Sequence, residues 1–378
     1  IRYRRTRYIV ARLPDPLPLR LNARSCGRAI RAIAPTVISR HGGIPRAQYT
    51  LPRLGPPGLV SCWTAPPTAA SPIRQTADGR ARSVVWSRGE PCTTQTGHAR
   101  MASTSLQRMT ALLAAPAPSS PLREAEQIVE QQFGIVGKAA PLGGERDQNI
   151  RIDAPDGAAY LLKIANPLDD SRAVEFQSHL LAHLAARDLE LPVPRIVTTT
   201  SGGLSATVAS GDGRRCAVRM LTFLPGTPVG TGAMGPALRA ELGSCLARID
   251  RALGDFAHPL GDRELIWNMM HAPDLMQLID HLPDSQHGAL ARRVIERFAA
   301  EVQPLLESTP AQTIYNDLNP SNILVDMAGG QRLRGVIDFG DAVYSRRIVD
   351  VAVAAAYQVR HTPDPWDAVC QLLAAYHR

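Results

Sequence analysis

From residue 121 onward, the apolar positions of the chain follow a mixed helix-and-strand pattern and then a purely helical one. Over 122–133, apolar residues recur at helical spacing with charged residues between them, which predicts an amphipathic helix. The same spacing predicts a second helix over 170–187. Short apolar runs bounded by turn residues predict strands, and these runs occupy 134–142, 149–152, 159–164, 194–208 and 216–224.

Beyond residue 225 the pattern predicts helices, over 236–254, 274–282 and 290–306. A β-rich part followed by a helical part is an α+β arrangement. We therefore expect two lobes with a cleft between them. The expected divisions are a linker over 101–120, an N-lobe over 121–224 and a C-lobe over 225–378.

The first hundred residues are rich in Arg, Pro, Ser and Thr and show no sustained period. Their patterned apolar surface is too small to offset the entropy of ordering, so we expect 1–100 to be a disordered extension. It is interpreted as a basic arm for an anionic partner, as an organelle-targeting peptide, or as upstream sequence that is not native protein. We favour the last, because no methionine precedes Met101 and the composition changes there.

The net charge of +8 is unevenly distributed. Residues 1–100 carry 17 Arg and three acidic residues, whereas 101–378 carry 25 basic and 31 acidic residues. The predicted lobes are therefore mildly acidic, and nucleic acid is not an expected partner. No apolar run is long enough to span a bilayer, so no membrane partner is expected. The six cysteines have no paired or metal-ligand spacing, which indicates reduced thiols in a cytoplasmic protein.

The most informative stretch for chemistry lies between residues 313 and 341. Asp317 and Asn322 are separated by a short turn, an apolar run follows, and Asp338 closes a second apolar run. Two strands flanking a turn would bring Asn322 and Asp338 to one point, where amide and carboxylate oxygens suit Mg²⁺. Asp317 would then accept a proton from a substrate hydroxyl in phosphoryl transfer. Each residue alone could be a turn or cap residue, but the ordered set favours the functional interpretation.

Lys163 ends an apolar strand and is one of only two lysines in the chain. A lysine among apolar residues is costly unless it is paired, and Glu175 in the following helix is the expected partner. The alternative is a surface lysine on an edge strand. Gly143 and Gly144 lie between two predicted strands, where they would allow the backbone to approach a nucleotide. No P-loop motif is present.

Taken in order, Lys163, Glu175, Asp317, Asn322 and Asp338 resemble the residue set of the aminoglycoside phosphotransferase-like kinase superfamily, a relative of the protein kinases. The resemblance covers roughly residues 120–378. Within this superfamily, the chain is most similar to the hydroxylysine kinase branch and to the N-terminal kinase-like domain of class III aminotransferase fusion proteins. The segments that carry the narrower similarity are 144–149, 162–167, His258-Pro259 with Arg263 and Trp267, and 336–345.

The resemblance implies a two-lobed protein-kinase-like fold and a phosphotransferase that uses Mg²⁺ with ATP or GTP as phosphoryl donor. It implies Asp317 as catalytic base, with Asn322 and Asp338 as magnesium ligands. The residues implied to bind the nucleotide are Lys163 as a phosphate contact, Glu175 as its ion-pair partner, and a hinge for the base that contains Met220, Thr222 and Phe223.

The implied acceptor is a small amino alcohol such as 5-hydroxylysine, although aminoglycosides, homoserine, choline or ethanolamine would use the same phosphate machinery. Arg263 is a candidate for a substrate carboxylate, because its planar guanidinium suits bidentate pairing. Its alternative role is an ion pair with Asp262 or Glu264 on a solvated helix face. Asp341 is a second substrate candidate.

The chain departs from the family pattern in two places. Tyr315 stands where the family usually has His, two residues before the catalytic Asp, and we expect it to brace the loop through packing and a hydrogen bond. The chain stops at Arg378 within a helix-like run, so the resemblance implies a truncated C-lobe. The alternative hypothesis is a non-catalytic kinase-like domain, covalently fused to a C-terminal aminotransferase-like domain in the full gene product.

Overall fold

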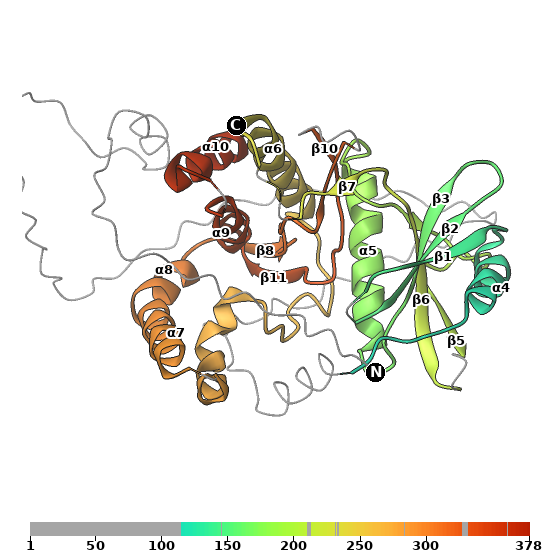
Figure 1. Ribbon diagram of the computed structural model, residues 1–378, viewed down its shortest axis with the longest axis horizontal. Coiled ribbons are helices and arrows are strands. Elements are labelled where there is room, and N and C mark those ends of the chain that lie inside the picture. The colour runs from blue at the N-terminus through green and yellow to red at the C-terminus, as the bar shows by residue number, and fades with distance from the viewer. Residues whose placement is uncertain are drawn as a thin grey trace, which may run out of the picture. The chain divides into compact units, whose positions relative to one another are not determined.

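A computed structural model of the chain (Figure 1) describes residues 115–144, 146–209, 213–230, 232, 234–282, 284–326, 332–360 and 362–378. The expectations for the extension over 1–100, and for most of the linker, concern residues outside these ranges. No described helix is long and apolar enough to cross a membrane.

The β-rich part is built on a six-stranded antiparallel sheet. Its hairpins follow from local sequence: between the second and third strands, Gly157 adopts φ +87° and the side chain of Asp156 accepts a hydrogen bond from Ala158 N at 2.9 Å. β5 (Ala206–Ala209) lies outside the main strand order of the sheet and pairs with β6 (Arg215–Thr222). That order is β1 (Lys138–Leu142), β2 (Gln148–Asp153), β3 (Ala159–Ile164), β6 (Arg215–Thr222) and β4 (Ile196–Val197).

Two helices cover opposite faces of this sheet (Figure 1). α4 (Leu122–Phe133) packs its buried stripe on one face and ends at Gly134, which takes φ +67°. α5 (Ser171–Arg187) begins at Asp170, whose side chain caps the helix by accepting from Arg172 N, and packs on the other face. Side chains alternate along a strand, so neighbouring residues of β3 and β6 face different helices.

The helical part contains the predicted long helix as α6 (Pro236–Leu253). Its leucines share one core with α5 and with the last helix, and Gly243 lies directly against the backbone of that helix. The remaining elements are β7 (Thr227–Pro228), η1 (Met269–His281), α7 (Ser285–Arg297), η2 (Phe298–Val302), α8 (Gln303–Glu307), β8 (Ala311–Ile314), β9 (Ile323–Val325), β10 (Leu333–Val336), β11 (Val343–Arg346), α9 (Arg347–Gln358) and α10 (Pro365–His377).

Two predicted helices differ in detail. The run over 274–282 lies in η1, a 3₁₀ helix that starts earlier and contains Pro273, whose missing N–H disfavours α-helical bonding. The run over 290–306 is divided into α7, a π-turn and α8, with Pro304 near the start of α8. Apolar spacing alone did not reveal these interruptions.

Candidate active site

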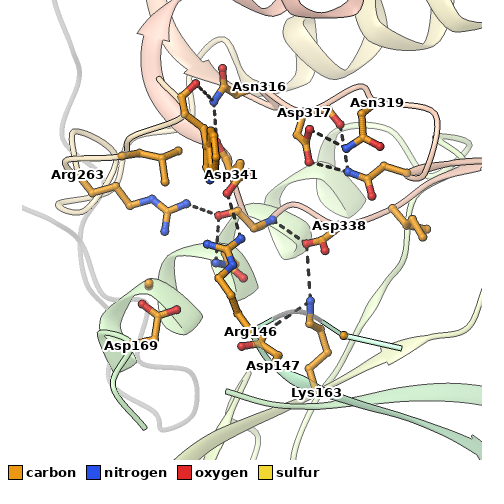
Figure 2. A pocket seen from close by; sticks show the side chains of 18 of the residues that line it. Arg146, Asp147, Lys163, Asp169, Arg263, Asn316, Asp317, Asn319, Asp338 and Asp341 are labelled. Atoms are coloured by element: carbon orange, nitrogen blue, oxygen red, sulfur yellow. Dashed lines mark hydrogen bonds and ion pairs between the residues drawn. The ribbon is translucent and has the colours of Figure 1, made fainter. Parts of the chain in front are cut away.

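A cavity of about 1100 Å³ lies between the β-rich and helical parts (Figure 2). It is lined by the β1–β2 loop, Lys163, the start of α5, the segment over 260–267, the loop over 316–322, the segment over 337–341 and one face of α9. Of the residues predicted for chemistry, the structure brings Asp317, Asn322, Asp338, Lys163, Gly143, Gly144, Arg263 and Asp341 to its wall.

The carboxylate of Asp317 is held by two amides of its own loop (Figure 2). Asn319 Nδ2 donates to Oδ1 at 2.8 Å, and Asn322 Nδ2 donates to Oδ2 at 2.7 Å. Burial raises the pKa of Asp317 to about 7, with neighbouring Asp341 and Asp338 adding to the rise, while the bonds from Asn319 and Asn322 oppose it. A carboxyl with this pKa is suited to accept a proton near neutral pH.

The loop that carries Asp317 is braced from behind. Asn316 adopts φ +67°, an uncommon conformation outside glycine. The Asp350 carboxylate accepts hydrogen bonds from Tyr315 N and Asn316 N, both at 2.8 Å. Tyr315 is fully buried, donates its hydroxyl to Ile337 O at 2.5 Å, and packs edge-on against Phe339 with ring centroids 4.7 Å apart. The predicted bracing role of Tyr315 is therefore confirmed.

Asn322 and Asp338 meet because their strands pair. β9 and β10 are antiparallel with Ile323 opposite Val336, and Ile337 N donates to Asn322 O at 2.9 Å. Asp338 follows with φ +57°, and its Oδ1 accepts from Gly340 N at 3.1 Å. The positive charge of Lys163 holds the pKa of Asp338 below its usual range. The carboxylate is therefore ionised and open to the cavity.

Lys163 has different partners from the one expected. Its Nζ lies 3.6 Å from Asp147 Oδ2 and 3.6 Å from Asp338 Oδ1, and its side chain is only 10% exposed. The expected pair with Glu175 is not formed: the Glu175 side chain is 58% exposed and lies 3.9 Å from His179 one turn along α5. Glu175 lies on α5, the helix that the sequence predicts for it. The rotation of α5 about its own axis turns Gln177, not Glu175, toward the cavity.

The glycine loop connects β1 and β2 as predicted. A Cβ atom on Gly144 would overlap the backbone carbonyl oxygen of Asp147, which cannot move aside as a side chain can, so only glycine fits here. Asn149 donates to Gly143 O at 3.0 Å. Arg146 at the end of the loop pairs with Asp341 at 3.2 Å and ties the loop to the opposite wall of the cavity.

Sequence reasoning missed Arg146, Asp147 and Asp169 as cavity residues. The first two belong to the segment 144–149 that carries the family resemblance, which is the signal that could have identified them. Asp169 precedes the cap of α5 and lines the cavity, and burial raises its pKa. No local pattern singled it out.

Arg263 lines the cavity, where contact with a substrate carboxylate stays a prediction, and its hydrogen-bond partners among the described residues are backbone carbonyls. Its Nη2 donates to the backbone carbonyls of Gly340 and Ala342, the latter at 3.0 Å. The guanidinium carbon also lies 5.5 Å from the centroid of the Phe176 ring. Arg263 therefore holds the segment that carries Asp341, and no described ion pair joins it to Asp262 or Glu264.

The predicted hinge residues do not line the cavity. The Met220 side chain is fully buried against α4, on the far face of the sheet. The backbone N–H groups of Thr222 and Phe223 donate to Arg195 O and Ala159 O, each at 2.9 Å. The strand alternation that places Lys163 toward the cavity sends the Met220 side chain away from it, and the role of this segment as a hinge for the base stays a prediction.

The comparisons with known proteins agree with this geometry. The model of the phosphotransferase enzyme family matches residues 138–377. Hydroxylysine kinase of Mus musculus is 31% identical over 276 residues, which is 67% of this chain and 73% of the relative. Homoserine kinase of Azorhizobium caulinodans is 29% identical over 197 residues, which is 52% of this chain and 56% of the relative.

Among solved structures, the amicoumacin kinase hAmiN in complex with AMP-PNP, Ca²⁺ and Ami superposes with a TM-score of 0.50. It is 15% identical in sequence, and the match covers 74% of this chain and 78% of that one. At this identity the likeness concerns the fold, which is the two-lobed kinase-like fold that the sequence predicts. The chain therefore belongs to the phosphotransferase enzyme family and is a small-molecule phosphotransferase.

Proposed function

We propose that this protein transfers the γ-phosphoryl group of ATP or GTP to the hydroxyl group of a small amino alcohol resembling 5-hydroxylysine. The observation that carries the proposal is the meeting of Asp317, Asn322, Asp338 and Lys163 at one cavity wall. A proton acceptor, two oxygen ligands and a cation are the groups that phosphoryl transfer requires.

Asp317 is the proposed base. The acceptor oxygen forms a bond to the γ-phosphorus while the bond from that phosphorus to the β–γ bridging oxygen breaks. The hydroxyl proton passes to Asp317, and the products are a phosphorylated alcohol and a nucleoside diphosphate. The two amides that bond to the Asp317 oxygens orient the carboxylate for this transfer.

The residues fit a magnesium ion. The Asn322 amide nitrogen is directed to Asp317, which leaves its Oδ1 as the acceptor atom of this side chain. The Asp338 side chain is 46% exposed and ionised. Hard oxygen ligands of this kind suit Mg²⁺, which when bound would neutralise charge on the phosphate groups. Lys163, whose Nζ lies 3.6 Å from Asp147 and 3.6 Å from Asp338, would be the cation that contacts phosphate.

The acceptor proposal rests on the relatives and on the charge of the cavity. The mouse relative is a hydroxylysine kinase by name. Asp169 and Glu264 line the same cavity as the Arg146–Asp341 pair, and an ammonium group on the acceptor would complement these carboxyls. The match to a homoserine kinase supports a smaller amino acid alcohol as the second candidate. Fusion to an aminotransferase-like domain and a cytoplasmic location remain predictions.

The test uses the full chain with a panel of amino alcohols, Mg·ATP and Mg·GTP. Loss of a general base lowers turnover by about 10²- to 10⁴-fold, so Asp317→Asn should reduce kcat by that amount while keeping the nucleotide-dependent rise in melting temperature. A chelator should remove that rise. Asp280→Asn is the matched control, because its carboxylate is 87% exposed. Equal turnover of Asp317→Asn and the unaltered protein would refute the proposal.

A further inference from the structure

A second pair of carboxyl groups lies behind the loop that carries Asp317. Asp250 on α6 and Asp350 on α9 are 2% and 0% exposed, and their side chains lie within hydrogen-bonding reach of each other. Tyr376 on α10 donates its hydroxyl to Asp250 Oδ2 at 2.5 Å. Three helices of the helical part thus meet at these carboxyls.

Two carboxylates cannot share a hydrogen bond unless one of them carries a proton. Both oxygens of Asp350 already accept backbone N–H groups of the loop, from Tyr315 and Asn316. Oδ2 of Asp250 accepts from Tyr376, whereas Oδ1 has no donor among the described residues. The network therefore assigns the proton to Asp250 Oδ1, which donates it to Asp350.

The surrounding charges agree with this assignment. Burial, followed by the charge of Asp350, raises the pKa of Asp250 to about 9. Burial raises the pKa of Asp350 only to about 6, because the loop N–H groups and the bond from Asp250 favour its ionised form. The hydrogen bond from Tyr376 on α10, and then the charge of Arg347 on α9, lower the pKa of Asp250 against this rise. The pair carries a single negative charge at neutral pH.

We propose that Asp250 acts as a neutral acid that holds the Asp350 carboxylate, and through it the backbone of the catalytic loop, in the position that Asp317 needs. The Asn316 backbone has φ +67°, and its N–H, like that of Tyr315, has the Asp350 carboxylate as its acceptor. Loss of the proton would place two negative charges side by side in a buried site. The pair would then separate, and the loop N–H groups would lose their acceptor. Asp250 is a positioning residue in this scheme.

The kinetic test rests on the proposed kinase activity. Asp250→Asn keeps the arrangement, because its amide NH₂ donates to Asp350 and its carbonyl oxygen accepts from Tyr376. We expect this variant to keep kcat within about threefold at pH 7. Asp250→Ala leaves the Tyr376 hydroxyl without its acceptor and removes one donor from Asp350, so it should lose about tenfold or more. Above about pH 9 the unaltered protein should lose kcat about tenfold per pH unit, and Asp250→Asn should not. A variant Asp250→Asn that is as impaired as Asp250→Ala, or that keeps the alkaline loss, would overturn the proposal.

The stability test does not depend on activity. Asp250 is ionised in the unfolded chain above about pH 4 but keeps its proton in the folded chain up to about pH 9, so folding takes up a proton between these values. The unfolding constant of the unaltered protein, relative to Asp250→Asn, should therefore rise about tenfold per pH unit between about pH 6 and 8. A ratio that does not change with pH would overturn the proposal even if no acceptor has been found. Asp280→Asn should show no such slope.

Discussion

The pH dependence of kcat/KM should report the ionisation of Asp317 in the free enzyme. Burial raises the pKa of this carboxyl to about 7. A base must be ionised to accept a proton, so activity is present above this pH and falls about tenfold per unit below it. This fall is the acid limb of the pH profile of kcat/KM. Two substitutions should move the acid limb in opposite directions along the pH axis, which distinguishes Asp317 from any other group that titrates nearby.

Asn319→Ala removes the donor that lies 2.8 Å from Asp317 Oδ1 and favours the ionised form. A hydrogen bond to a charged group contributes about 1.5–3 kcal/mol, and one pKa unit corresponds to about 1.4 kcal/mol. Asp317 is half-buried, so solvent screening reduces the full effect. We therefore expect Asn319→Ala to raise the pKa of Asp317, and with it the acid limb, by about half to one pH unit. Asp341→Asn removes a charge that raises the pKa of Asp317, so it should shift the limb downward.

The assay is the initial rate of nucleoside diphosphate release from the full chain, at acceptor concentrations well below KM and constant ionic strength. Ser321→Ala is the control, because Ser321 lies in the same loop and only its backbone N–H bonds to Asn319. If both substitutions move the acid limb in the same direction, or if Asn319→Ala moves it downward, Asp317 is not the group that limits the rate.

Two further predictions follow from contacts in the structure. Gly243→Ala should destabilise the protein by about 1–3 kcal/mol in urea unfolding, because the added Cβ would lie 2.9 Å from Ala375 Cβ and Tyr376 N of α10. Gly254→Ala is the control, because its added Cβ would have its nearest contact at 3.3 Å. Equal destabilisation by the two substitutions would contradict the close packing of α6 and α10. Lys163→Met should lower kcat/KM by about 10²-fold or more. Glu175→Gln should change kcat/KM less than about twofold, because the Glu175 side chain is 58% exposed and pairs with His179. Equal losses of kcat/KM in the two variants would indicate that Lys163 and Glu175 act as the ion pair expected from the sequence.

The sequence by itself determined the α+β order of the elements and which polar residues stand in the loops at the cavity. Asp317, Asn322 and Asp338 could be recognised because each stands at a fixed place beside a short apolar run, and strand pairing then brings the ends of those runs together. The bracing role of Tyr315 could also be predicted, because the resemblance to the family marks its position two residues before Asp317. Period and turn residues act over short stretches, and a sequence shows them directly.

Only the tertiary structure decided which charged groups pair. Lys163 pairs with Asp147 and Asp338 rather than Glu175, because the rotation of α5 against the sheet turns Glu175 outward. Arg146 and Asp341 lie 195 positions apart, and Asp250 and Asp350 come from different helices. Such contacts depend on how whole elements pack against each other, and burial there also sets the pKa values. A one-dimensional pattern contains neither the rotation of a helix nor the depth of a side chain.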